Sequence, residues 1–307
     1  MAKKKIIYAE KSLILKESYI QFDTPNIPPS NFASRSIIAI GNDVYFMGGT
    51  SQKDNYKYNI IDNTCIKMTD IPVSFTGRGA VAIGMDIYIF ISNFAYKYNT
   101  LTNTYTRLLD IPTDGTSISA VVIGTNIYIL GLRLGADNYK YDTLTNIYTK
   151  MANIPYDARG CTAVAVGTDI YIVGGNTSPF TQNYKYDTLL NTYTVKLNVP
   201  YSLWNCSSTI AVGTDLYIFA NSETNYEYKA YKYNTLTNTY NTLITSPRYM
   251  PQVTPVLIGS FIYLFKAPLL TQFKFNLVDV YNLYINGTTK FNGQTIIGNG
   301  WTQVPIQ

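Results

Sequence analysis

One pattern recurs six times along this chain, and no other feature limits its fold as strongly. The first anchor of the pattern is a glycine that stands four residues ahead of a tyrosine. The second anchor is an aromatic-Lys-aromatic triplet followed by Asn or Asp. Consecutive glycines lie 40 to 46 residues apart. The glycines are Gly41, Gly84, Gly124, Gly167, Gly213 and Gly259, and the triplets begin at Tyr56, Tyr96, Tyr139, Tyr184, Tyr231 and Phe273.

The copy at residues 163–200 indicates what one unit folds into. Two apolar runs flank a tight turn at Gly167. From Tyr184, aromatic and charged residues alternate with the period of two that is typical of a half-buried strand, and a fourth extended run starts at Tyr193. A sheet of four short strands cannot bury both of its faces alone, so it needs copies of itself on either side. Repeats of about 40–50 residues with four strands have the spacing of propeller blades. We therefore predict an all-β fold, a six-bladed β-propeller of four-stranded antiparallel blades.

The order of motifs within the repeat resembles the kelch repeat. The best copy reads Ile-Tyr-Ile-Val-Gly-Gly at 170–175, Tyr-Lys-Tyr-Asp at 184–187 and Asn-Thr-Tyr at 191–193, and Ile-Pro follows the fourth strand in several copies. The resemblance covers residues 36–285. It implies a kelch-type propeller, a fold that hosts both enzymes and binding modules, so the likeness by itself decides no function.

Two departures separate these repeats from the usual kelch pattern. The double glycine survives only at Gly48-Gly49 and Gly174-Gly175. The Trp that the family carries on the fourth strand is replaced here by other residues. These are Tyr105, Tyr148, Tyr193 and Tyr240, with Cys65 in the first copy.

The two ends of the chain must supply whatever closes the ring. Residues 19–23, followed by Ile27-Pro28, resemble the end of a blade. We expect residues 1–35 to act as a closing segment that lends an outer strand to the last blade, residues 36–286 to form the blades, and residues 287–307 to be a polar tail. Residues 280–285 are the other candidate for the outer strand. The tail carries Trp301 and resembles, faintly, the Trp-containing ends of some phage tail proteins, so a terminus could attach the chain to a larger assembly.

Membrane insertion is not expected. No apolar run approaches the roughly 18–20 residues that a membrane helix needs. The basic start and the apolar residues behind it could open a signal peptide, but Glu10, Lys11, Lys16 and Glu17 interrupt that run too early. We expect synthesis in a cytoplasm without a signal peptide, with release as part of a particle as a further possibility.

Catalysis is not expected either. The chain has no His, which excludes Ser-His-Asp and Cys-His arrangements and His metal sites. Its three cysteines include no Cys-x-x-Cys pair. Asp43, Asp86, Asp169 and Asp215 stand in tight turns, where aspartate is first a turn former. We predict no catalytic residues, no metal and no cofactor.

The net charge of +5 suggests nucleic-acid binding, but the placement of lysines argues against it. One lysine stands at the same site of every copy, so the lysines would be spread around the ring rather than gathered into a patch. These residues are Lys57, Lys97, Lys140, Lys185, Lys232 and Lys274. No nucleic-acid partner is predicted.

The two faces of the predicted ring differ in how much they vary between copies. Turns between first and second strands and between third and fourth strands share one face, which we call the constant face because its sequence hardly changes. Loops between second and third strands and between blades share the other, the variable face. Repeats that diversify on one side point to a binding surface there. Its candidate ligand-binding residues are Arg35, Phe75, Arg78, Arg133, Tyr156, Arg159, Tyr201, Trp204, Arg248 and Tyr249.

Arginine and aromatic side chains are typical of interaction hot spots and sugar sites. Trp204 could instead plug the ring. The favoured hypothesis is a non-catalytic recognition module for a surface ligand, a glycan by preference, on a phage tail or a tail-like bacteriocin. An intracellular kelch-type scaffold for a peptide or protein partner is the first alternative, and a glycan-processing enzyme is the second.

Overall fold

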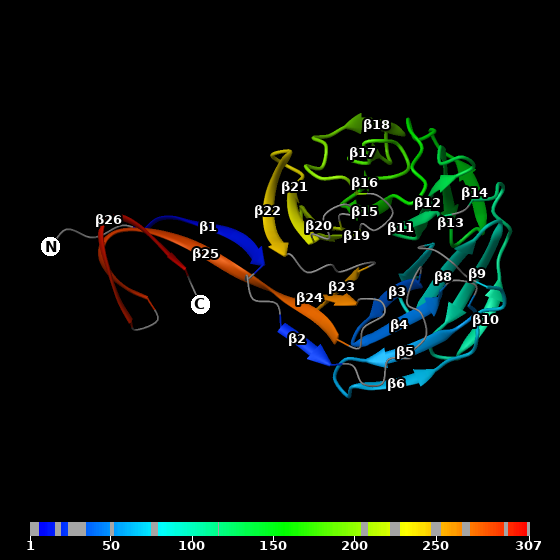
Figure 1. Ribbon diagram of the computed structural model, residues 1–307, viewed down its shortest axis with the longest axis horizontal. Helices are drawn as coiled ribbons and strands as arrows, with labels where there is room; N and C mark the ends of the chain where they lie inside the picture. The colour runs from blue at the N-terminus through cyan, green and yellow to red at the C-terminus, as the bar shows by residue number, and fades with distance from the viewer. Residues whose placement is uncertain are drawn as a thin grey trace.

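The computed structural model shows a ring of β-sheets with a strand-built extension on one side (Figure 1). It describes residues 6–15, 20–23, 35–49, 52–74, 79–115, 117–203, 208–221, 228–246, 253–265, 271–291 and 294–305. Side chains are described for residues 35–49, 52–74, 79–115, 117–203, 208–220, 229–243 and 253–265. No helix in these ranges is long and apolar enough to cross a membrane.

Five four-stranded antiparallel sheets form five blades, and each runs outward from the ring centre in chain order. Blade 1 has β3 (Arg35–Ile40), β4 (Asp43–Gly48), β5 (Asn55–Asn59) and β6 (Thr64–Lys67). Blade 2 has β7 (Ala80–Ile83), β8 (Asp86–Ile91), β9 (Phe94–Asn99) and β10 (Thr104–Arg107). Blade 3 has β11 (Ser119–Ile123), β12 (Asn126–Leu132), β13 (Asp137–Asp142) and β14 (Ile147–Lys150). Blade 4 has β15 (Thr162–Val166), β16 (Asp169–Val173), β17 (Asn183–Asp187) and β18 (Thr192–Val195), and blade 5 has β19 (Ser208–Val212), β20 (Asp215–Asn221), β21 (Tyr228–Asn234) and β22 (Thr239–Ser246).

A partial sixth sheet contains β23 (Thr254–Ile258), β24 (Phe261–Phe265) and the start of β25 (Thr271–Phe291). The short strand β2 (Ile20–Asp23) pairs antiparallel with β25, with Ile20 opposite Lys274. This pairing places part of the N-terminal segment beside the last sheet, where the sequence analysis expects it. Residues 280–285 continue β25 and do not form a separate outer strand. That the N-terminal segment closes the ring stays a prediction, as does the division into domains.

Strand β25 runs on beyond the ring and carries the extension seen in Figure 1. On one side it pairs with β1 (Ile6–Leu15), and on the other with β26 (Gln294–Pro305). Most of the expected polar tail, residues 287–307, therefore lies in the end of β25 and in β26.

The six repeated glycines open two-residue turns between the first and second strands. All six have a positive φ between 58° and 62°, and in each turn only this first residue does. A type II′ hairpin turn has this requirement, and glycine meets it without a steric penalty from Cβ. The repeated glycine of the sequence is therefore explained by backbone geometry alone.

Apolar cores lie between neighbouring blades. The core between blades 2 and 3, for example, contains Phe90, Ile129 and Tyr141, which are fully or almost fully buried. An equivalent cluster joins Phe46 of blade 1 to Phe265 of the sixth sheet, whose rings meet edge to face with centroids 5.2 Å apart. Each blade thus buries its two faces against its two neighbours, as the propeller prediction requires.

The fourth-strand tyrosines tie neighbouring blades together. The side-chain amide of Asn138 in blade 3 donates to the hydroxyl of Tyr193 in blade 4 (2.9 Å), and Asn183 donates to Tyr240 of blade 5 in the same way (2.8 Å). Asn55 and Tyr105 repeat the bond between blades 1 and 2. A buried polar group must find such a partner, and here the partner is in the next blade.

Four of the repeated lysines pair within their own blades. Nζ of Lys185 lies 3.0 Å from Asp169, and Nζ of Lys232 lies 2.8 Å from Asp215. Lys57 and Lys97 pair with their own turn aspartates at 3.5 Å.

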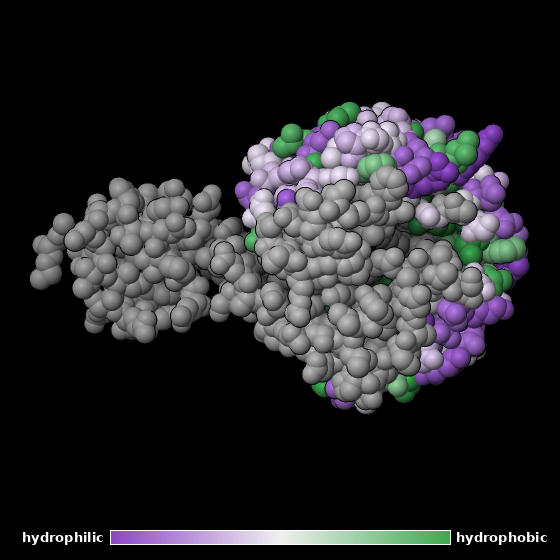
Figure 2. All heavy atoms as spheres, viewed as in Figure 1, coloured by the Kyte–Doolittle hydropathy of each residue, from purple (hydrophilic) through white to green (hydrophobic). Residues whose placement is uncertain are grey.

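In the space-filling view hydrophilic residues cover much of the visible rim of the described blades, with apolar ones interspersed (Figure 2).

Candidate functional site

Backbone hydrogen bonds confirm that the loops divide between two faces. On the constant face, Thr143 in a third-to-fourth turn donates its N–H and its hydroxyl to the carbonyl of Thr125 in the adjacent first-to-second turn. On the variable face, Ile154 in an inter-blade loop donates to Ala136 in a second-to-third loop (2.7 Å). Val199 and Thr181 make the same bond one blade later (2.9 Å).

Half of the candidate ligand-binding residues have described side chains. Phe75, Arg78, Trp204, Arg248 and Tyr249 lie outside the described residues. The other five lie in three parts of the variable face. Arg35 starts β3 at the ring centre, Tyr156 and Arg159 lie in the loop between blades 3 and 4 with Arg133 in the second-to-third loop of blade 3, and Tyr201 follows blade 4.

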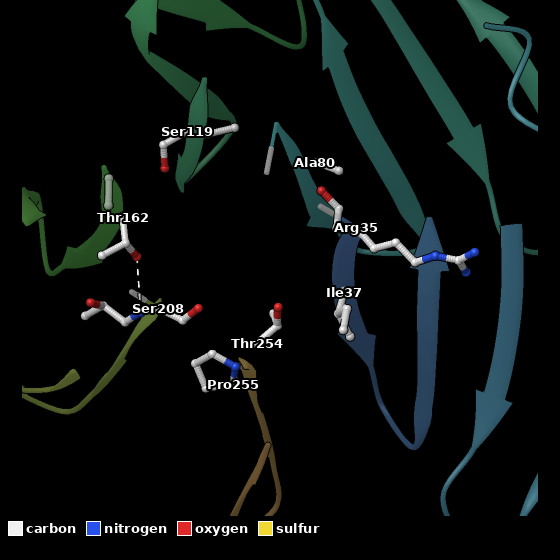
Figure 3. Close-up of a pocket in the computed structure, with 12 residues that line it drawn as sticks. Arg35, Ile37, Ala80, Ser119, Thr162, Ser208, Thr254 and Pro255 are labelled. Atoms are coloured by element: carbon white, nitrogen blue, oxygen red, sulfur yellow. Dashed lines mark hydrogen bonds between the residues drawn. The ribbon is translucent and has the colours of Figure 1, made fainter. Parts of the chain in front are cut away.

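Arg35 is a buried residue. Its side chain has no exposed surface, and its Nη2 lies 3.3 Å from the carboxylate of Asp54. Burial lowers the pKa of the guanidinium, and the neighbouring Asp54 opposes that shift. Figure 3 shows the guanidinium pointing away from the central cavity that the backbone of Arg35 borders. Arg35 therefore braces blade 1 and does not present its charge to a ligand at the surface.

Arg159 is held by a brace that joins the inter-blade loop to blade 4. Its Nε lies 2.9 Å from Oδ1 of Asp157, and its Nη2 bonds to Oδ2 of the same carboxylate. Asn176, in the second-to-third loop of blade 4, donates to that carboxylate at 2.9 Å. The hydrogen bonds from Arg159 lower the pKa of Asp157. The Arg159 side chain is 37 % exposed, so a fixed guanidinium faces solvent.

Glycines make room for this brace. A Cβ on Gly135, which has a φ of 85°, would lie 2.0 Å from Oδ1 of Asp157. A Cβ on Gly175 would lie 2.8 Å from the ring of Tyr156. That ring stacks on Tyr184 with centroids 5.0 Å apart. Gly175 of the double glycine in blade 4 therefore allows the close approach of the inter-blade loop that carries Tyr156 and Asp157.

The remaining two candidates differ in exposure. Arg133 is exposed, with a φ of 38° in the turn after β12, and its N–H donates to the carbonyl of Asp114. Tyr201 is half-buried, and Nζ of Lys229 lies 4.3 Å from the centre of its ring. The structure thus places Tyr156 and Arg159 in one inter-blade loop, where Tyr156 stacks on Tyr184 and Arg159 pairs with Asp157, while Arg35 is directed to Asp54.

A ring of hydroxyls at the mouth of the central channel was missed by the sequence reasoning. The fifth residue before each repeated glycine is Ser or Thr in five copies and glycine in the second. These residues start the innermost strands on the variable face, where a cavity of about 120 Å³ opens between them (Figure 3). The recurrence of Ser or Thr at this position is visible in the sequence, but small polar residues are common in strands and do not by themselves indicate a site. The hydroxyl-bearing residues are Ser36, Ser119, Thr162, Ser208 and Thr254.

Some of these hydroxyls also join the inner strands. The N–H of Thr209 in blade 5 donates to Oγ1 of Thr162 in blade 4 (3.1 Å), and the hydroxyl of Ser208 donates to the carbonyl of Val253 beside the sixth sheet. Below the mouth the channel becomes apolar, with a further 410 Å³ lined mainly by Ala, Val and Ile. Small side chains fit there because the blades converge on the axis.

The chemistry available at the mouth is hydrogen bonding without charge. Apart from Arg35, whose charge is turned away, every described residue that lines the cavity is neutral. No group of three or more potential metal ligands occurs among the described residues. Burial raises the pKa of the Cys65 thiol to about 11 and that of Tyr141 to about 12, so these groups keep their protons at neutral pH.

Comparison with known families matches one repeat of the chain. The family described as Kelch motif matches residues 158–195, which include the Asp157–Arg159 loop from Ala158 onward and all of blade 4. No curated protein matches the chain. The matched range excludes residues 287–307, so the likeness of that tail to phage tail proteins stays a prediction.

Proposed function

Because the chain is a propeller in which one repeat matches the Kelch motif, we propose that it is a non-catalytic binding module that recognises a surface glycan through its variable face. The observation that carries this proposal is the brace at Arg159. Two hydrogen-bonded atoms of one carboxylate hold the guanidinium, and Asn176 of the neighbouring loop holds the carboxylate.

A guanidinium held in this way loses little conformational entropy when it binds. Planar, paired donors suit carboxylates, phosphates and vicinal sugar hydroxyls, and prior ordering of the side chain lowers the cost of association. The exposed Arg133 and the half-buried Tyr201 lie on the same variable face. Arginine beside aromatic surface is a combination found in carbohydrate and protein hot spots alike.

The experiment is a glycan array combined with binding to whole cells. Once a ligand is found, Arg159→Ala, Trp204→Ala and Tyr249→Ala should each weaken binding by roughly 1–3 kcal/mol while the melting temperature changes little. Asp169→Ala and Asn191→Ala, on the constant face, are the controls and should alter folding rather than affinity.

The outcomes separate the three function classes. The proposal is supported if the protein binds a glycan and the variable-face variants weaken that binding. If no glycan on the array binds but a peptide or protein partner does, the intracellular scaffold is favoured. Turnover of a sugar would favour the glycan-processing enzyme. If a folded constant-face variant loses binding while all three variable-face variants bind normally, the binding site lies on the constant face and the proposal is wrong.

A further inference from the structure

The mouth of the central channel offers a second, different recognition surface on the variable face. Figure 3 shows the hydroxyls of Ser119 and Thr254 directed toward the cavity from opposite sides of the ring. Ser119 is buried and makes no side-chain hydrogen bond to any described residue. Its hydroxyl is therefore available to a molecule in the cavity.

Thr209 provides an independent observation. It is only 9 % exposed and lines the same cavity, and its Oγ1 is buried without a hydrogen-bond partner among the described residues. Its backbone N–H, by contrast, is satisfied by Thr162. A buried hydroxyl without a partner costs free energy that an isosteric methyl group would avoid. Threonine at this position is explained if a ligand or its water completes the bond.

The lining also defines what such a ligand can be. Each hydroxyl both donates and accepts a hydrogen bond, as a sugar hydroxyl does. The apolar atoms of Ala80, Ala120 and Pro255 border the same space and suit the C–H surface of a sugar ring. A carboxylate or phosphate placed here would lose its hydration and meet no opposite charge among the described lining residues, because the guanidinium of Arg35 is directed to Asp54.

We propose that this hydroxyl-lined mouth is a subsite for a neutral, hydroxyl-bearing group, such as the unsubstituted edge of a terminal sugar, and that it selects against acidic sugars. The inference rests on the proposed glycan-binding function and assigns the chemical class of the group that enters the channel. The volume of about 120 Å³ admits part of one residue, so the rest of a glycan would lie across the variable face toward Arg159.

The test uses the full chain and small probes of known charge. Methyl glycosides of glucose, galactose, mannose and N-acetylglucosamine are compared with glucuronate and galacturonate by saturation-transfer NMR and competition. We expect at least one neutral glycoside to bind at millimolar concentration and its uronate counterpart to bind about fivefold more weakly or worse.

Two substitutions distinguish recognition from a structural role. Thr209→Val preserves shape and removes the buried hydroxyl, so the melting temperature should stay the same or rise while neutral-glycoside affinity falls about fivefold. Ser119→Ala should lower affinity to a similar degree. The control is Thr145→Val, an exposed threonine of a constant-face turn, which should leave affinity unchanged.

Three results would overturn the inference. They are equal or tighter binding of the uronates, no neutral glycoside binding at millimolar concentration, and unchanged affinity in both Thr209→Val and Ser119→Ala. If the array and cell tests succeed and depend on Arg159 while the channel variants bind normally, only the channel subsite fails. If the array is silent and no glycoside binds, the glycan-binding function fails with it.

Discussion

The two faces of this ring are held together in different ways. On the constant face one arrangement is repeated in all five complete blades, where a third-strand tyrosine hydroxyl donates to an asparagine of the following turn at 2.6 to 2.9 Å. That asparagine has a positive φ in every copy, and in blades 2 to 5 it also accepts a backbone N–H from the preceding blade. On the variable face, the Asp157–Arg159–Asn176 brace occurs once among the described residues.

This difference suggests that the constant face contributes stability and the variable face contributes binding. Hydrogen bonds that link each blade to the next must recur in every copy, because a ring is stable only if every junction between blades is stable. Bonds that shape a binding surface need occur only where a ligand makes contact. We therefore expect substitutions on the constant face to lower stability and spare binding, and substitutions on the variable face to do the reverse.

The largest effect is expected from a change at neither face but at the edge of the last sheet. Deletion of residues 1–23 removes β2 and leaves the outer edge of the last sheet open. Open edges are aggregation liabilities, so this truncation should aggregate or lose much of its melting temperature. Deletion of residues 1–15 is the matched control, because it removes β1 and keeps β2. An unchanged melt for the longer deletion would show that the N-terminal segment does not close the ring.

A smaller effect, confined to the constant face, is expected from Asn191→Ala. The substitution removes the acceptor for the Tyr186 hydroxyl and for the N–H of Ala152, and it places alanine at a φ of 56°. We expect a loss of about 3 kcal/mol in the free energy of unfolding, measured by urea denaturation, with ligand affinity preserved in the folded fraction. Asn153→Ala, at an exposed position of the inter-blade loop, is the control. A loss no larger than that of the control would contradict the division between faces.

Two glycines allow a direct comparison of the faces. Gly167→Ala, on the constant face, meets no atom within 4 Å, so it should cost only the strain of a positive φ, about 1 kcal/mol, and leave binding intact. Gly135→Ala, on the variable face, adds a clash with Asp157 and should also disrupt the brace and weaken binding. Gly167→Asn should cost less than Gly167→Ala, since asparagine tolerates this backbone conformation better. Equal effects of both alanine variants on affinity would argue against the brace.

The smallest effect is expected from pH. The pKa of Asp157 is lowered below its ordinary value by its bonds to Arg159. A depressed folded-state pKa means that the stabilisation is fully present above about pH 3.8 and is lost as the pH falls through the lower folded value. The melting temperature of the Asp157→Asn variant should therefore fall less steeply below pH 4 than that of the unsubstituted protein. Parallel curves for the two proteins would indicate that the brace contributes nothing to stability.

Much of the fold could be predicted from the sequence, because its determinants are local and repeated. A glycine that needs a positive φ, an alternating strand and a turn-forming Asn-Thr-Tyr each act within a few residues of one another. Counting them six times was enough to predict all-β, four-stranded antiparallel blades and the division into two faces. The sixth sheet was harder, because its partner strand lies at the opposite end of the chain and no local signal records the pairing of Ile20 with Lys274.

The site depended on contacts that no local pattern contains. Sequence alone placed Arg35 and Arg159 together on one face as equivalent candidates, since both are arginines in variable segments. Only the tertiary structure turned Arg35 into a buried partner of Asp54 and left Arg159 held outward by Asp157 and Asn176. The hydroxyl ring likewise becomes a cavity only when first strands from different blades meet at the axis. Residue type is written in the sequence, whereas the direction of a side chain depends on which distant neighbours compete for it.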